Sequence, residues 1–130
     1  MISGYISWLQ QQDFYKDTTI VVVGDHLGMQ TDFYTENIPE NYTRTIFDLY
    51  INAPLSPTKE KERTFMSFDT FPTTLASMGV TIEGDKLGFG TNLFSSQPTL
   101  AETIGLDNVN NEVKKHSSYY QACIFGGDCN

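Results

Sequence analysis

Residues 19–28, Thr-Ile-Val-Val-Val-Gly-Asp-His-Leu-Gly, decide the fold expected for this chain. The short apolar run is rich in β-branched residues and predicts a buried strand that ends at Gly24. Asp25 and His26 follow side by side, so an oxygen ligand and a nitrogen ligand come together at the carboxyl end of that strand. Open α/β sheets place their active sites at this edge. The stretch therefore predicts an α/β fold with Asp25 and His26 in its site.

The Asp25-His26 pair is a candidate metal site. A divalent cation such as Mn²⁺ or Zn²⁺ accepts one carboxylate and one imidazole, and charged side chains next to a buried strand are costly without a partner. The structural alternative is that Asp25 caps a loop and His26 forms a local hydrogen bond. Two ligands do not complete a site, and the chain has one other histidine and no evident nucleophile motif. We therefore expect one part of a catalytic domain, with no catalytic residue assigned.

Composition limits the class of protein. With 130 residues, 39% hydrophobic and 18% charged, the chain forms at most one globular domain or a piece of one. A net charge of −8 argues against nucleic acid as a partner. It would also repel anionic lipids unless a metal or a basic region offset it. The best apolar run is strand-sized, whereas a transmembrane helix needs about 20 apolar residues, so no membrane span is predicted.

The beginning of the chain predicts a helix over 2–15 followed directly by a strand over 18–23. This order is half of a βαβ unit, and a buried parallel strand needs neighbours on both sides. The missing partner strand would precede Met1, where no signal peptide is visible. Either the protein is cytosolic or its targeting part lies upstream, and we favour an upstream part.

The middle of the chain predicts a polar loop, a second strand and a charged turn. The loop covers 27–44 and includes a glycosylation sequon at Asn41. Such a short pattern is common, so a solvated loop without glycosylation is the simpler interpretation. The strand covers 45–53, where prolines follow it. The charged cluster over 58–64 is expected to be solvated surface.

The later part predicts a helix over 69–78 with Asp69 as its N-cap and with a buried stripe of Phe71, Leu75 and Met78. A short edge strand over 80–82, a glycine-rich loop over 86–94 and a short helix over 99–104 follow.

The carboxyl-terminal end predicts a last helix over 108–124, with His116 as a core or surface histidine. Cys123 and Cys129 form either a local disulfide or two free thiols, and a zinc site built from this pair alone is improbable because structural zinc sites usually have four ligands.

Four segments in order resemble one superfamily. Residues 24–28 resemble the Asp-His metal motif of the alkaline phosphatase and sulfatase superfamily, and residues 44–54 are similar to the strand that follows it. Residues 67–75 resemble its Asp-x-x-Pro-Thr-Leu helix start. Residues 86–95 look like the carboxyl-terminal part of bacterial phosphoglycerol transferases, the group that includes lipoteichoic acid synthases and the enzymes that decorate membrane-derived oligosaccharides.

The resemblance implies a fold and a domain organisation. The fold would be part of an alkaline-phosphatase-like sandwich, with a central, mostly parallel sheet flanked by helices. Residues 1–102 would be the carboxyl-terminal segment of the catalytic domain, and residues 103–130 a helical tail that resembles nothing known to us. Members of this group are polytopic membrane proteins, so the parent protein would carry this segment on the extracytoplasmic face of the bacterial cell membrane.

The resemblance also implies an activity. Such enzymes move phosphoglycerol from phosphatidylglycerol to a cell-envelope glycan or polyglycerol phosphate acceptor, through a phospho-threonine-type intermediate. Asp25 and His26 would be two metal ligands, with Mn²⁺ the first choice and Zn²⁺ the alternative. The nucleophile, the acidic ligand and the substrate-binding residues of the family have no counterpart here, so we expect the upstream part of the domain to be a partner and this chain alone to be inactive.

Two other functions stay open. A sulfatase or phosphoethanolamine transferase segment would share the metal motif, although residues 86–95 favour the phosphoglycerol transferase. A non-catalytic interaction module, derived from the enzyme by truncation, would explain the missing ligands.

Overall fold

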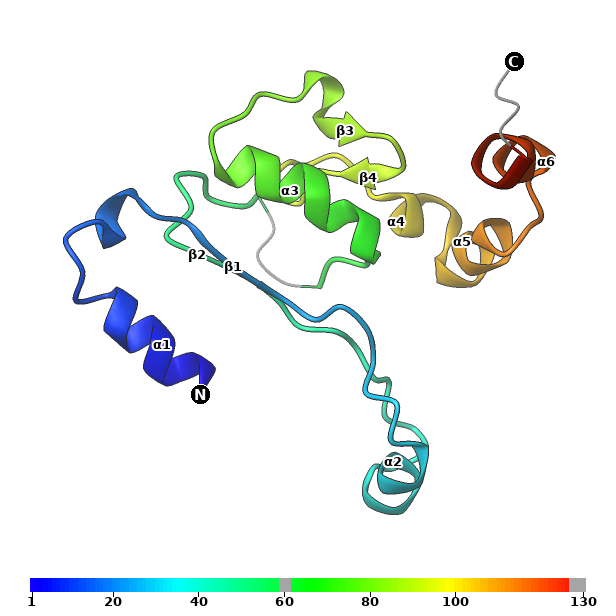
Figure 1. Ribbon diagram of the computed structural model, residues 1–130, viewed down its shortest axis with the longest axis horizontal. Coiled ribbons are helices and arrows are strands. Elements are labelled where there is room, and N and C mark those ends of the chain that lie inside the picture. The colour runs from blue at the N-terminus through cyan, green and yellow to red at the C-terminus, as the bar shows by residue number, and fades with distance from the viewer. Residues whose placement is uncertain (59–61, 127–130) are drawn as a thin grey trace.

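The computed structural model describes residues 1–58 and 62–126 as a mixed α/β structure. Its helices and strands follow in the order α1 (Ile2–Leu9), β1 (Ile20–Val23), α2 (Thr31–Asn37), β2 (Asp48–Ile51), α3 (Thr70–Ser77), β3 (Lys86–Leu87), β4 (Gly90–Thr91), α4 (Leu100–Ile104), α5 (Leu106–Val113) and α6 (Ser118–Tyr120). Figure 1 shows a central unit of α3, β3 and β4, with the β1–β2 ribbon below it and α4 to α6 on one side.

The strands β1 and β2 form an antiparallel pair in which Ile20 lies opposite Ile51 and Val23 opposite Asp48. The predicted strands over 18–23 and 45–53 are thus confirmed, with shorter bounds. Both sheets in the described residues are two-stranded and antiparallel, so the α/β class is present without the mostly parallel central sheet. Beyond the sheet, the two segments continue side by side as an arm that leads to α2 (Figure 1).

The loop predicted over 27–44 is therefore only partly correct, because α2 forms within it. Polar residues interrupt the apolar periodicity of this short helix, so a pattern search for a buried stripe misses it. None of its residues is buried. The hydrogen bonds that support it are local, from Thr35 Oγ1 to the Thr31 carbonyl and from Asn37 Nδ2 to the Phe33 carbonyl.

A buried carboxylate organises the central unit. Asp69 is fully buried, and its carboxylate accepts hydrogen bonds from the backbone N–H of Met66 at 2.8 Å and of Thr91 at 2.7 Å. The first bond caps the turn that leads into α3, and the second attaches β4 to it. Gly90 packs so closely on the Phe68 carbonyl that a Cβ has no room there. The β3–β4 hairpin is therefore fixed on the start of α3.

Threonine hydroxyls extend this network along α3. Thr73 Oγ1 donates to the Asp69 carbonyl at 2.7 Å and accepts from the backbone N–H of Leu93 at 2.9 Å. Thr73, Thr91 and Thr99 are all buried, whereas the buried hydrophobic side chains of the described residues are few. Buried polar groups are tolerated when each has a partner. The interior of this unit is consequently held mainly by satisfied polar contacts.

The prediction that Phe71 and Met78 lie on the buried face of α3 is wrong. Phe71 and Met78 are about three-fifths exposed, and the buried face consists of Pro72, Thr73, Ala76 and Ser77. Small and hydroxyl-bearing residues allow β4 to approach closely and to hydrogen-bond with the helix, which the larger side chains would prevent. The expected edge strand over 80–82 is also absent, since the paired strands are β3 and β4, joined through Gly88 at φ 61°.

The Arg63 side chain is only 8% exposed, which corrects the prediction of a solvated cluster over 58–64. Residues 59–61 of that cluster lie outside the described residues. The Arg63 guanidinium donates to the carbonyls of Leu93, Ser95 and Gln97 and pairs with Glu102 at 2.7 Å. The Arg63 hydrogen bonds are the main reason that the pKa of Glu102 falls to about 2. Arg63 thus holds the segment after β4 against α4.

The carboxyl-terminal helices are shorter than predicted. The helix expected over 108–124 is divided into α5 and α6, and His116 lies between them, exposed to solvent. After α6 the chain continues as a π-helix over Gln121–Gly126. Thr99 and Glu102 form a reciprocal capping box at the start of α4, and Ala101 and Val109 are buried where α4 meets α5. The domain boundary expected after residue 102 falls within α4. No helix in the described ranges 1–58 and 62–126 is long and apolar enough to span a bilayer.

We predict that Asp69→Ala destabilises the chain by about 3 kcal/mol, because it removes two charge-assisted hydrogen bonds and leaves buried N–H groups unsatisfied. Urea unfolding followed by circular dichroism measures this change. Asp13→Ala, at an exposed position, is the control and should change stability by less than about 0.5 kcal/mol. Equal effects of the two substitutions would show that Asp69 does not organise the central unit.

Candidate metal site

Asp25 and His26 lie directly after β1, where the backbone bends out of the strand. Just before the bend, the Gly24 N–H donates to the Phe47 carbonyl at 2.7 Å, and a Cβ at Gly24 would lie 3.3 Å from the Ile46 side chain. Neighbouring side chains on a regular strand point to opposite faces. The bend instead brings Asp25 Oδ2 to 3.4 Å from His26 Nε2.

A hydrogen bond of the His26 ring indicates which of its two nitrogens could bind a metal. Its Nδ1 lies 2.8 Å from the carbonyl oxygen of Leu27. A carbonyl only accepts, so Nδ1 carries a proton and donates it. In the neutral imidazole Nε2 then has the free lone pair, and a backbone carbonyl on the other nitrogen is the usual support of a metal-binding histidine. The available nitrogen is the one that faces Asp25.

The distance between these two atoms would allow both of them to bind the same ion, and it does not discriminate between Mn²⁺ and Zn²⁺. Two ligand atoms on a tetrahedral ion with bonds of about 2.0–2.1 Å lie roughly 3.3 Å apart, and the Nε2 to Oδ2 distance is 3.4 Å. Asp25 Oδ1 accepts from the backbone N–H of His26 at 2.8 Å, which fixes the carboxylate beside the ring. The side chains are 87% and 58% exposed for Asp25 and His26 respectively, so further ligands can approach.

The loop that follows the pair is held by Arg44. Its guanidinium lies 3.7 Å from the centre of the Tyr34 ring, and Nη2 donates to the Gly28 carbonyl. The Tyr34 hydroxyl in turn lies against Gly28 so closely that a Cβ has no room at that position. These contacts join α2 to both segments of the arm and restrain the backbone two residues after His26.

The site is incomplete within the described residues. Residues 1–58 and 62–126 contain no cluster of three or more His, Cys, Asp or Glu side chains that could hold a metal ion. His116 lies exposed between α5 and α6, and Asp69 is engaged with backbone N–H groups. Cys123 lies in the last described turn, and Cys129 lies outside the described residues. The described residues thus place two candidate ligand atoms side by side and no third one near them.

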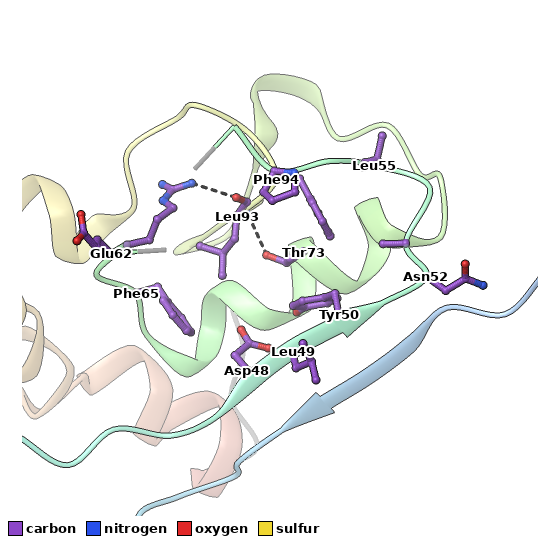
Figure 2. Close-up of a pocket in the computed structure, with 13 residues that line it drawn as sticks. Asp48, Leu49, Tyr50, Asn52, Leu55, Glu62, Phe65, Thr73, Leu93 and Phe94 are labelled. Atoms are coloured by element: carbon purple, nitrogen blue, oxygen red, sulfur yellow. Dashed lines mark hydrogen bonds between the residues drawn. The ribbon is translucent and has the colours of Figure 1, made fainter. Parts of the chain in front are cut away.

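A second carboxylate, Asp48, was not singled out from the sequence. Figure 2 shows it with Tyr50 at the edge of a cavity between β2 and α3. Both of its carboxylate oxygens are buried, and neither has a hydrogen-bond partner among the described residues. Burial raises the pKa of Asp48 to about 6. The signal in the sequence is a charged residue within the apolar run of a predicted strand, Thr-Ile-Phe-Asp-Leu-Tyr-Ile. Burial of an ionised carboxylate at such a position is costly unless the group is paired and hydrogen-bonded.

Comparison with known proteins yields no match to a protein family, to a curated protein or to a solved structure.

We predict that Mn²⁺ binds weakly at Asp25 and His26, because these residues supply only part of a coordination shell. Paramagnetic broadening of the amide NMR signals of residues 24–28 would report it. His26→Ala and Asp25→Asn should each abolish the local broadening, and His116→Ala is the matched control that should leave it unchanged. Broadening at residues 24–28 that survives both site substitutions would contradict the assignment.

We predict that Asp48 destabilises the chain as pH rises. Its folded pKa of about 6 lies above the usual 3.8, so the folded state binds more protons between these values and loses stability as pH rises through the interval. A shift of this size corresponds to at most about 3 kcal/mol, and partial solvation reduces our expectation to about 1 kcal/mol.

Urea unfolding of the native chain and of Asp48→Asn at pH 4 and pH 7 measures this effect. The variant should gain about 1 kcal/mol relative to the native chain between the two pH values, with other titrating groups such as Asp69 cancelling in the difference. A constant difference across this range would mean that Asp48 titrates normally.

Proposed function

We propose that this chain is a carboxyl-terminal segment of a phosphoglycerol transferase-like catalytic domain, and that Asp25 and His26 supply two of its metal ligands. The observation that carries the proposal is the convergence of Asp25 Oδ2 and the free Nε2 of His26 at 3.4 Å, on the bend that directly follows a strand. Local hydrogen bonds orient each side chain, and Oδ2 and Nε2 form an ion pair when His26 is protonated. The proposal is supported by the fact that these two atoms, each of a type that can bind a metal, face each other.

Packing of the resembling segments supports the same proposal. Residues 67–75 and 86–95, which resemble the superfamily independently of the Asp-His motif, are bound to each other through Asp69 to Thr91 and through Thr73 to Leu93. Their polar residues therefore serve the architecture of the domain. We therefore assign metal binding to the loop after β1, where Asp25 and His26 are exposed.

The bound cation would stabilise the charge on the phosphoryl oxygens and on the attacking alkoxide. Asp25 would lower the net charge of the site and hold the cation from one side. His26 would bind through Nε2 with its ring oriented by the Leu27 carbonyl. The remaining ligands and the nucleophile would come from the upstream part of the same domain. The substrates would be the phosphatidylglycerol headgroup and a glycan or polyglycerol phosphate acceptor, on the extracytoplasmic face of the membrane.

Exposed apolar surface is consistent with additional protein around this segment. In the described residues β1 pairs along one edge only, although its four residues are all apolar. Ile2, Tyr5 and Trp8 of α1 are at least half exposed. Open edges and apolar faces of this kind normally pair or are covered. We propose that the remaining, mostly parallel strands of the sheet add at the free edge of β1.

We predict that His26→Ala reduces turnover by more than about a hundredfold in the polypeptide that contains this chain and the upstream catalytic part. Loss of a residue that merely orients a ligand costs up to about that factor, so loss of the ligand itself should exceed it. Transfer of glycerol phosphate from phosphatidylglycerol, monitored by release of diacylglycerol, is the measurement.

His116→Ala is the matched control and should retain full turnover. Normal turnover in His26→Ala would refute the role of the pair. Absence of any transfer by the unmodified polypeptide, together with retained binding of its upstream part to this chain, would favour a non-catalytic interaction module.

A further inference from the structure

A cavity of about 510 Å³ lies between β2, α3 and the segment that follows β4. Its walls are largely apolar and aromatic and include Tyr50, Phe65, Leu93 and Phe94 (Figure 2). The rings of Tyr50 and Phe94 meet edge to face, with centroids 5.5 Å apart. Pockets of 300–1,000 Å³ with apolar walls and a few polar groups are typical of small-molecule sites. The volume and lining therefore suit a ligand with an apolar part.

The Asp48 carboxylate lines this cavity, and within the part of the chain that the structure describes it has no hydrogen-bond partner. Both of its oxygens are buried and unbonded. The other polar groups facing the cavity from the strand and helix are engaged: the Tyr50 hydroxyl donates to the Thr70 carbonyl, and Thr73 Oγ1 bonds to Asp69 and Leu93. A ligand that satisfies Asp48 must therefore bring hydrogen-bond donors.

The negative charge of Asp48 limits the kind of ligand that this cavity can bind. Arg63 also lines the cavity, but its guanidinium is used by Glu102 and by three backbone carbonyls, so it does not neutralise Asp48. An ionised carboxylate in such surroundings is stabilised by a positive charge that carries donors. A metal ion would require more ligands, and the described residues supply no group of three. Aromatic faces nearby add attraction for an organic cation.

We propose that this cavity binds a primary ammonium on a short apolar stem, with the ammonium on Asp48 and the stem against Tyr50, Phe65 and Phe94. The source is either a free amine or a lysine side chain of another polypeptide, because both present the same group. The site uses neither Asp25 nor His26 and stands independently of the proposed transferase function.

The test is an NMR titration of the full chain with n-butylammonium and with Nα-acetyl-lysine methylamide. Each probe that binds should give saturable shifts at Asp48, Tyr50 and Leu93. Asp48→Asn should weaken binding at least tenfold, the order expected for loss of a charged hydrogen bond. Asp13→Asn removes the same charge from a position that does not line the cavity, and it should leave the affinity within about twofold.

A comparison on the unmodified chain tests the proposal without any substitution. The neutral probe 1-butanol has a similar stem and should bind at least tenfold more weakly than n-butylammonium. Preference for n-butylammonium supports a free amine, and preference for the lysine derivative supports a side chain of a partner. Equal binding of butanol, unchanged binding to Asp48→Asn, or no saturable binding of either amine would overturn the proposal.

Discussion

The buried carboxylate of Asp69 is the constraint on which the central unit depends. It receives one backbone N–H from the turn before α3 and one from β4, segments more than 20 positions apart in the sequence. Burial raises its pKa, and the two backbone hydrogen bonds partly oppose that rise. A carboxylate in this position is costly to bury alone, so these partners are needed for the fold to form. The same contacts place Thr73 and Arg63 where they hold the segment over 93–97.

This polar interior has a consequence for the surface. Because hydroxyl groups and small side chains occupy the packed face of α3, its large apolar residues Phe71 and Met78 are left outside. Large apolar side chains are also exposed on α1, and in the described residues β1 is paired along one edge only. Apolar residues exposed together on several elements are expected where a protein contacts further polypeptide. This distribution of exposed apolar side chains thus agrees with the proposal that the segment belongs to a larger domain.

Local signals predicted β1, β2 and the start of α3, and they failed for other elements. The helix expected over 2–15 ends at Leu9, and the hairpin of β3 and β4 lies where a loop was predicted. The Asp69 side chain accepts from the Met66 N–H and not from the first turn of α3, so its predicted N-cap role is wrong. Other errors concern long-range partners. Nothing in the local sequence around Arg63 indicates that Glu102 lies 39 positions away to bind it. The burial of Thr73 instead of Phe71 depends on where β4 packs, and α2 lacks the apolar stripe by which a helix is recognised.

Asp25 and Asp48 show why one carboxylate was found in the sequence and the other was not. Both lie near the paired ends of β1 and β2, since Val23 is opposite Asp48. Asp25 is exposed beside His26, so the adjacent residues suggest a candidate ligand pair in the sequence itself. Asp48 is defined by its burial and by its lack of a partner, and both properties arise only after α3 and the segment following β4 cover β2. A candidate ligand pair of adjacent residues can therefore be proposed from the sequence alone, whereas an unpartnered buried carboxylate becomes visible only in the tertiary structure.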